Sequence, residues 1–124
     1  MGRQKTNLET LGTLWPQAKL YFVAHAVVCD DDYLIVSMLR KQLESIGYEA
    51  TGCLDPLDAL DRLERDAGIR ALFSDWQMPG FSGIDVLTVV QQRFPLVRRI
   101  LVTAAPNEPE VREALASGLV QFLL

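Results

Sequence analysis

Short apolar runs alternate with amphipathic stretches along the chain from residue 21 onward. The runs are rich in valine, isoleucine and leucine, which is typical of strands buried on both faces of a sheet. The stretches between them repeat apolar residues at helical spacing, so the pattern predicts an α/β fold with a parallel sheet and covering helices. We expect five strands, at residues 22–29, 48–53, 70–74, 99–103 and 119–123.

The first two helices are marked by apolar spacing and by end signals. Ile35 and Leu39 lie one turn apart in the first helix, and Gly47 follows it at the position of a left-handed C-terminal cap. The second helix is expected to begin at Asp55, whose carboxylate can accept hydrogen bonds from free backbone N–H groups, and to stop at Gly68. Both helices therefore fall between strands, as an α/β fold requires.

Two further helices are expected in the second half of the chain. The third should occupy residues 83–94, because Pro95 marks its end. The fourth should occupy residues 107–117, with Asn107 as its N-cap and Pro109 early in its first turn. With these helices, each pair of consecutive strands is joined by one helix.

Residues 1–20 precede this alternating pattern, and we expect them to form an N-terminal extension or linker. Within them Leu8, Leu11 and Leu14 recur at helical spacing, which favours a short helix. The segment fits a linker, a dimerising helix or residues added for expression. The sequence leaves these possibilities open.

The other end of the chain is expected to be cut short. The alternating pattern assigns residues 21–124 to one folded domain, and its last strand is followed directly by the final residue, Leu124. A fifth helix should follow that strand, because a parallel sheet is normally covered on both faces. We therefore expect a C-terminally truncated domain that lacks its last helix.

Length and charge exclude several classes of protein. A chain of 124 residues fits a single domain, and 12 basic against 16 acidic side chains argue against a nucleic-acid surface on it. No apolar run is long enough to cross a membrane and no secretory signal is recognisable, so a cytoplasmic location is expected. Cys29 and Cys53 have neither a disulfide framework nor a metal-binding spacing around them, and we expect buried, reduced thiols.

Acidic residues follow two of the predicted strands. Asp30, Asp31 and Asp32 come directly after the first, and Asp75 follows the third. In a doubly wound sheet these two strand ends meet, so the carboxylates would repel one another unless a cation were bound. Oxygen ligands of this kind suit Mg²⁺, and an aspartate beside Mg²⁺ can accept a phosphoryl group. Asp32 fits the cap of the first helix better than a metal ligand, and Thr103 would bring a hydroxyl to the same edge.

The order of these motifs carries a family resemblance. Residues 27–32 (VVCDDD), 75–80 (DWQMPG) with Gly83, 103–105 (TAA) and 118–123 follow one another at compatible spacing. In this combination the chain resembles a response-regulator receiver domain of two-component signalling, from about residue 23 to the last residue. The resemblance implies a flavodoxin-like, doubly wound, five-stranded parallel sheet with strand order 2-1-3-4-5.

The resemblance also implies a role for several single residues. Asp75 would be the phosphoacceptor, and Mg²⁺ would be held by Asp30, Asp31, Asp75 and the backbone carbonyl of Gln77. Thr103 would bind the phosphoryl group and act as the switch hydroxyl. The family's lysine would be expected immediately after the last residue, so its absence bears on whether this chain is competent for phosphorylation.

The aromatic switch residue of the family corresponds to Phe122. In the family this side chain packs inward when the switch hydroxyl is drawn toward the phosphate. At Phe122 the same side chain is also expected to be part of the core in every state.

The resemblance therefore implies a Mg²⁺-dependent phosphoacceptor in a two-component phosphorelay, not an enzyme. Its implied partner is a histidine kinase or a histidine phosphotransfer protein, with self-dimerisation as a further possibility. One alternative is a degenerate receiver that acts as an interaction module without phosphorylation. A second is a phosphatase of the haloacid-dehalogenase type, but those enzymes need an acid two residues after the nucleophile, where this chain has Gln77.

Overall fold

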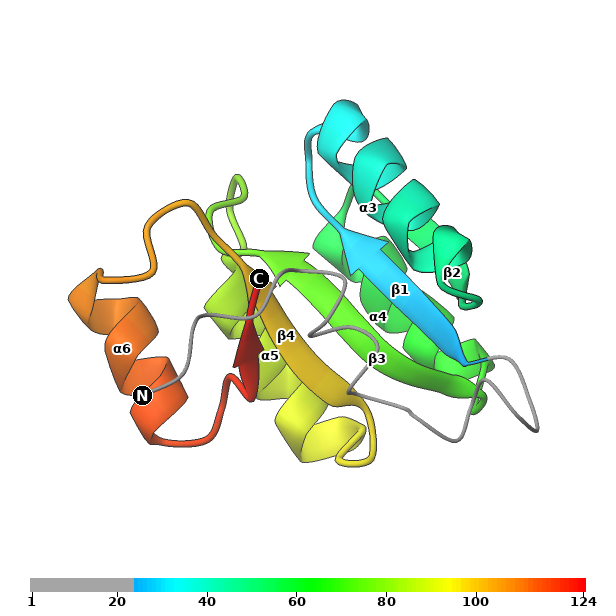
Figure 1. Cartoon of the computed structure of the whole chain (residues 1–124). Coiled ribbons are helices and arrows are strands. Elements are labelled where there is room, and N and C mark those ends of the chain that lie inside the picture. Colours follow the sequence, from blue (N-terminus) through cyan, green and yellow to red (C-terminus); the bar gives the residue numbers. More distant parts are fainter. Residues whose placement is uncertain (1–23) are drawn as a thin grey trace.

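The structure is a computed structural model that describes residues 24–124. Five parallel strands form one sheet in the order β2-β1-β3-β4-β5, which confirms the predicted doubly wound topology (Figure 1). From β1 the chain adds β2 on one side of the sheet, and it then adds β3, β4 and β5 on the other side. The carboxyl ends of β1 and β3 therefore flank the switch point, where this direction changes. The strands are β1 (His25–Cys29), β2 (Glu49–Cys53), β3 (Ile69–Asp75), β4 (Arg98–Val102) and β5 (Phe122–Leu123).

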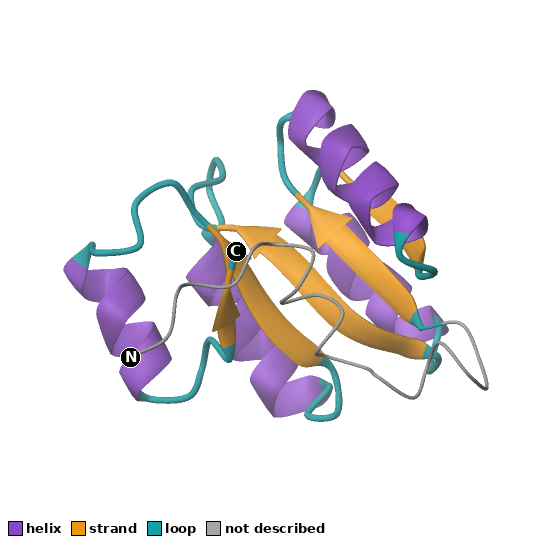
Figure 2. Ribbon diagram, in the orientation of Figure 1, coloured by secondary structure: helices purple, strands orange, loops and turns teal. Residues whose placement is uncertain are grey.

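Four helices connect these strands and lie in two layers (Figure 2). The core on one face joins α4, α5 and α6 to Val27, Leu72 and Leu101, whereas the core on the other face joins α3 to Val28 and Phe73. Neighbouring residues of a strand thus face opposite layers, as the pleat requires. The helices are α3 (Tyr33–Ser45), α4 (Pro56–Arg65), α5 (Gly83–Arg93) and α6 (Pro109–Ala116).

The expected caps of the first two helices are confirmed. The Asp32 carboxylate accepts a hydrogen bond from the Leu34 N–H at 2.9 Å, and Asp55 caps α4 in the same way. Gly47 follows α3 with a φ of 97° and donates its N–H to the carbonyl of Glu44. Because the left-handed region is strained for residues with a Cβ, glycine suits this C-terminal cap.

The N-cap prediction for the fourth helix was wrong. Glu108, not Asn107, occupies the N-cap of α6, and its side chain makes no capping hydrogen bond. Pro109 explains the shift, because proline is favoured at the first helical position and holds the residue before it in an extended conformation. Glu108 has that extended geometry, with φ −60° and ψ 138°.

Within the described residues, most element boundaries differ from the predictions by one or two residues, and two differ by more. Helix α4 ends at Arg65 instead of continuing to Gly68, because Asp66 turns extended and accepts a hydrogen bond from the Gly68 N–H. The last strand begins at Phe122 instead of residue 119. The chain before it is held by Arg99, whose guanidinium donates to two backbone carbonyls of residues 118 and 119, so it is not free to extend the strand.

The cysteine prediction is confirmed. Cys29 and Cys53 are paired in register on β1 and β2, and both are buried and free. Removal from water raises the pKa of each thiol to about 12. Both side chains therefore stay protonated at neutral pH and behave as small apolar core residues.

The expected short helix around Leu11 and the start of the first predicted strand lie outside the described residues. No helix within residues 24–124 is long and apolar enough to cross a membrane. The α3 side of the sheet carries no further described helix after β5.

Candidate metal and phosphoryl site

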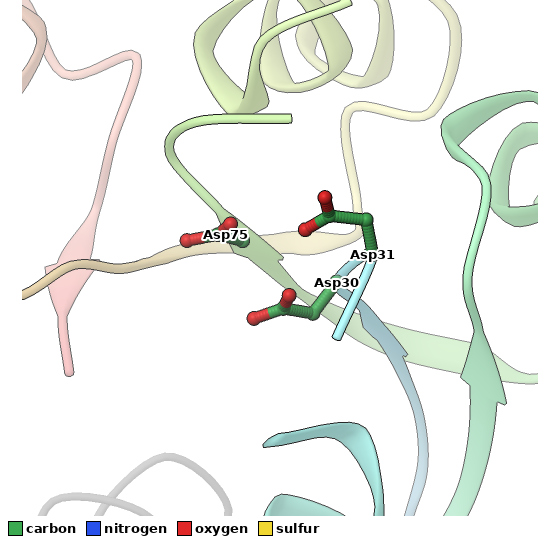
Figure 3. Close-up of side chains that lie close together, drawn as sticks. All are labelled: Asp30, Asp31 and Asp75. Carbon is green, nitrogen blue, oxygen red and sulfur yellow. The ribbon is translucent and has the colours of Figure 1, made fainter. Parts of the chain in front are cut away.

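Three carboxylates meet at the carboxyl edge of the sheet, at the switch point of the strand order. Asp30 and Asp31 follow β1 directly, and Asp75 is the last residue of β3 (Figure 3). One oxygen atom of each lies within 4.8 Å of the others. The structure thus brings together the three acidic residues that the sequence placed after two separate strands.

An open cavity of about 460 Å³ lies over these carboxylates. Its floor and walls come from the loop after β1, the end of β3 and the loop after β4, so three strands that are distant in sequence contribute to it. The lining residues are Asp30, Asp31, Asp32, Ile35, Asp75, Val102, Thr103 and Ala104.

Burial and mutual repulsion disfavour charge in this cluster. Loss of water raises the pKa of Asp30 to about 6, with further upward contributions from Asp75 and Asp31, while a hydrogen bond from the Asp32 N–H opposes the shift. Burial also raises the pKa of Asp75, and the nearby Asp31 adds to that effect. Within residues 24–124 no basic side chain forms an ion pair with any of the three. The cluster therefore lacks compensating positive charge from the described part of the chain.

Short backbone contacts hold Asp75 in place. The next residue, Trp76, donates its N–H to the Val102 carbonyl and accepts from the Gly83 N–H at 2.7 Å. A Cβ on Gly83 would collide with the carbonyl oxygen of Asp75, so only glycine permits this approach. The loop after β3 thus returns to its own starting point before α5 begins.

Side chains fasten the same loop at two further points. Met78 is buried in the core, where its sulfur lies 3.8 Å from the thiol of Cys29. Ser82 and Asp85 form a reciprocal capping box at the start of α5, with bonds of 3.2 and 3.1 Å. The sequence analysis named neither role, although the Ser-x-x-Asp spacing was a readable signal for the cap.

Thr103 lines the same cavity as Asp75, as its position after β4 predicted. Its N–H donates to the Leu124 carbonyl at 3.2 Å, and its hydroxyl oxygen accepts from the Ala105 N–H at 2.9 Å. Accepting that bond leaves the hydroxyl proton free to be donated elsewhere. Thr103 is therefore equipped to donate a hydrogen bond to an anion in the cavity.

Two of the predicted site residues lie away from the cavity lining. Gln77 sits in the exposed loop after β3, and its N–H, with that of Trp76, acts to lower the pKa of Asp75. Phe122 lies in β5, paired in register with Ile100, and is half-buried on the α3 side of the sheet. The metal-binding role of the Gln77 carbonyl and the switch role of Phe122 stay predictions.

A second cavity of about 500 Å³ lies between β1, β2 and α4, but its chemistry is different. His25 spans it with contacts of 2.8 Å to the Thr51 hydroxyl and 3.1 Å to Asp66. The acidic and basic side chains of α4 that line it are paired one turn apart, Asp58 with Arg62 and Asp61 with Arg65. The acidic side chains of α4 in this cavity are thus paired with basic ones, whereas the carboxylates of the acidic cavity have no such partners among residues 24–124.

The donor set of the acidic cavity fits Mg²⁺. This ion prefers hard oxygen ligands and is usually held by one or two carboxylates together with water and phosphate oxygens. Asp30, Asp31 and Asp75 supply three such groups within reach of one ion, and the absence of a paired cation in residues 24–124 leaves their charge to be neutralised. The residues could therefore hold a divalent ion. An anion bound to that ion would lie beside Asp75 and Thr103.

We expect Asp30→Asn to stabilise the metal-free protein at pH 7.5 by about 2 kcal/mol. The pKa of Asp30 is raised to about 6 in the fold, so folding resists ionisation. The stability that comes from the protonated form is complete below the ordinary pKa near 3.8 and is lost as the pH rises to about 6. The gain in stability of Asp30→Asn over the wild type should thus appear between about pH 4 and 6 and stay constant above pH 6.

Urea unfolding of both proteins from pH 3.5 to pH 8, with a chelator present, measures this difference. Excess Mg²⁺ should stabilise the wild type and leave Asp30→Asn nearly unchanged, since an ion that binds only the folded state shifts its stability. A gain in the variant that is equally large at pH 3.5 would show that the effect does not come from ionisation of Asp30.

Comparison with known proteins agrees with this geometry. The family model of the response regulator receiver domain matches residues 26–124. The chemotaxis protein CheY1 of Helicobacter pylori is 27% identical over 101 residues, which cover 79% of this chain and 82% of that protein. The cyclic di-GMP phosphodiesterase response regulator RpfG of Xanthomonas campestris is 32% identical over 124 residues, 96% of this chain but only 32% of that protein.

A solved structure shows the same fold. The response regulator TrrA of Thermotoga maritima, crystallised in complex with Mg²⁺-BeF, superposes with a TM-score of 0.71 at 24% identity and covers 82% of this chain and 85% of its own. The family match extends over nearly all of the described residues and includes every carboxylate of the acidic cavity. This chain therefore belongs to the response-regulator receiver domain family of two-component signalling.

Proposed function

We propose that this chain is a Mg²⁺-dependent phosphoacceptor whose acceptor residue is Asp75. The observation that carries the proposal is the approach of Asp30, Asp31 and Asp75 to within 4.8 Å at the switch point of the sheet. Family membership supports it, as does the relative from Thermotoga maritima that was crystallised with Mg²⁺-BeF. We assign the whole of residues 21–124 to this receiver domain.

Asp75 is the nucleophile in the proposed reaction. One of its carboxylate oxygens attacks the phosphorus atom of the donor, and the bond between phosphorus and the leaving group breaks as the new P–O bond forms. With a phosphohistidine donor that is protonated on its second ring nitrogen, the imidazole leaves with the bonding electron pair and is released as neutral histidine. The product on this chain is an acyl phosphate.

The other residues of the cavity orient the phosphoryl group and offset its negative charge. Asp30 and Asp31, with Asp75 and the Gln77 carbonyl, would hold Mg²⁺, which offsets negative charge on the phosphoryl oxygens when it is bound. Asp30 keeps its place through the 2.8 Å hydrogen bond from the Asp32 N–H. The Thr103 hydroxyl donates a hydrogen bond to a phosphoryl oxygen, which stabilises the transferring group further.

Signal output follows from the acyl phosphate. A histidine kinase or histidine phosphotransfer protein supplies the phosphoryl group, and the bound phosphate favours a conformation in which Thr103 moves toward it. Phe122 then packs further inward. Thr103 and Leu124 share a backbone hydrogen bond, so a shift at the cavity is passed directly to the strand that carries Phe122.

Intact-protein mass spectrometry after incubation with acetyl phosphate tests the proposal. We expect an adduct of one phosphoryl group that requires Mg²⁺ and is released by hydroxylamine, which cleaves acyl phosphates. If folded, Mg²⁺-loaded protein acquires no adduct from acetyl phosphate or from a phosphorylated phosphotransfer protein, the phosphoacceptor proposal fails. A receiver that acts through protein contacts without phosphorylation is then what remains.

We expect Thr103→Ala to slow phosphoryl uptake by about tenfold to a hundredfold, since a hydrogen bond to a charged group contributes about 1.5–3 kcal/mol. Thr103→Ser should retain most of the rate because it keeps the hydroxyl. Both rates are read from the growth of the adduct with time under saturating Mg²⁺. Equal rates for the alanine and serine variants would show that the hydroxyl does not contact the phosphoryl group.

A further inference from the structure

An apolar groove of about 230 Å³ lies at the amino edge of the sheet, and we call it the amino-edge groove. It opens between the end of α4, the start of β3 and the loop that joins α5 to β4. In that loop Leu96 is 85% exposed, more than any other large apolar residue of the described part of the chain. The apolar lining consists of Leu63, Ile69, Phe94, Pro95, Leu96 and Val97. The groove could therefore take up an apolar side chain from another surface.

Positive charge without a partner borders this groove. Arg70 lines it, and Arg98 is the first residue of β4, directly after the lining loop. Within residues 24–124 neither arginine forms an ion pair, and Arg70 donates only to a backbone carbonyl, at 3.1 Å. Asp66, the acidic residue of the lining, is already paired with His25 at 3.1 Å. A surface that binds here should thus carry both apolar and acidic side chains.

A surface of that kind lies where β2 passes into α4. Leu54 and Leu57 are 49% and 65% exposed there, and Asp55 and Asp58 are exposed beside them. We call these four residues the α4 patch. Among residues 24–124 Asp55 forms no ion pair, and Asp58 has only a 3.7 Å contact to Arg62. The patch therefore offers the apolar and acidic side chains that suit the amino-edge groove.

The patch and the groove cannot meet within one molecule. All five strands are parallel, so their carboxyl ends share one edge of the sheet and their amino ends share the other (Figure 1). The α4 patch follows β2 at the carboxyl edge, whereas the groove precedes β4 at the amino edge. A strand of five residues such as β4 spans roughly 16 Å. Contact between the two surfaces therefore requires two molecules.

The distribution of charge over the domain favours such a contact. Residues 24–124 carry nine basic and fifteen acidic side chains, so two copies repel each other in most orientations. Asp30, Asp31 and Asp75 add to the negative charge of the carboxyl edge, where the α4 patch lies. When this edge faces the amino edge of another copy, its aspartates approach Arg70 and Arg98. Charge complementarity thus selects the orientation in which unlike edges meet.

We propose that copies of this chain associate head to tail, with the α4 patch of one copy seated in the amino-edge groove of the next. Leu57 enters the apolar groove, and the carboxylates of Asp55 and Asp58 face Arg70 and Arg98 of the next copy. The association does not involve phosphoryl transfer, so its test needs no phosphoryl donor.

The contact has two consequences for the assembly. Patch and groove are different surfaces, so the contact is heterologous and leaves a free patch at one end and a free groove at the other. Association is therefore open-ended and does not stop at a dimer. An interface formed by one groove and four residues is small, so it should be weak and transient.

Static light scattering of the full chain tests the proposal at protein concentrations up to about 1 mM, where weak contacts are populated. We expect the average mass of the wild type to keep rising with concentration and to show no plateau at the dimer. Leu57→Arg and Leu96→Glu each place a repelling charge in the contact at an exposed position, and each variant alone should stay monomeric. Met38→Arg is the matched control, because Met38 is an exposed residue of α3 on the other face of the sheet. It should associate as the wild type does.

A mixture of the two variants gives the sharpest readout. Leu57→Arg keeps an intact groove, and Leu96→Glu keeps an intact α4 patch. An equal mixture can therefore form one contact between unlike variants and then has no surface left to continue. We expect heterodimers and no larger species.

The other outcomes overturn the proposal. A wild type that stays monomeric at the highest concentration shows that the surfaces do not bind each other. Association that survives in Leu57→Arg or in Leu96→Glu shows that other residues mediate it. A mixture that stays monomeric shows that the patch and the groove do not meet.

Salt provides a second readout that uses no variant. Because the paired charges lie at exposed positions, raising the ionic strength screens them, and we expect the association of the wild type to weaken. Association that is unchanged or stronger at high salt contradicts the pairing of the aspartates with Arg70 and Arg98.

Discussion

Asp75→Asn is expected to abolish phosphorylation of this chain. Asparagine has nearly the same shape as aspartate, so the loop after β3 should keep its contacts to Val102 and Gly83. Its neutral amide is a poor nucleophile and cannot form the acyl phosphate. The adduct measured by intact mass with acetyl phosphate and Mg²⁺ should therefore fall below detection, while the variant stays folded.

Asp85→Asn is the matched control for this loss. Asp85 lies close by in α5, where its carboxylate accepts from the Ser82 N–H in the capping box. Its replacement should leave the adduct intact and lower the stability by about 1 kcal/mol through the weakened cap. If Asp75→Asn were modified as fully as the wild type, the phosphoryl group would sit on another residue and Asp75 would not be the acceptor.

Gly83→Ala is expected to destabilise the protein by about 3 kcal/mol or more. The added Cβ would strike the carbonyl oxygen of Asp75 and lie 2.8 Å from its carbonyl carbon. Both of these atoms belong to the backbone, so no rotation of a side chain can relieve the contact. Either β3 and α5 must separate or the 2.7 Å hydrogen bond from the Gly83 N–H to Trp76 must break.

Gly118→Ala separates this clash from the general effect of replacing glycine. Gly118 has a φ of 82°, but a Cβ there would meet no atom within 4 Å. Alanine should therefore lower the stability by only about 1–2 kcal/mol through backbone strain. Chemical unfolding of both variants gives the comparison, and equal losses would mean that the approach of Gly83 to Asp75 is looser than the structure describes.

The damage from Gly83→Ala should extend to the acidic cavity. Because the relief of the clash moves the backbone of Asp75, we expect weaker binding of Mg²⁺ together with the lower stability. Gly118→Ala lies in the turn before β5 and should bind Mg²⁺ as the wild type does. Titration followed by tryptophan fluorescence measures both, in a background in which Trp15 is replaced by phenylalanine so that the signal comes from Trp76, the residue next to Asp75.

The acidic cluster was predictable because the position of each carboxylate follows from the residues next to it in the sequence. A carboxylate that follows an apolar run lies at the carboxyl end of a strand, and parallel strands share that edge. Asp30, Asp31 and Asp75 could thus be placed together before any distance was known. The helix caps at Asp32 and Asp55 were equally local, since each depends on its own backbone turn.

The features that sequence reasoning missed depend on contacts between distant residues. The late start of β5 results from the guanidinium of Arg99, which holds two carbonyls about 20 positions further along the chain. The placement of Met78 against Cys29 joins the loop after β3 to the end of strand β1, and the two residues are 49 positions apart. The Asn107 prediction failed for another reason: asparagine is a good cap, but Pro109 fixed the helix start one residue later.

The two buried cysteines make this protein convenient for spectroscopy. Each thiol is 1% exposed and has a pKa near 12, so it offers neither access nor thiolate to a maleimide or a methanethiosulfonate reagent. These are the only two cysteines in the chain. A single cysteine introduced on the surface of α6 could therefore be labelled selectively with a spin probe or a dye while the native pair remains in place.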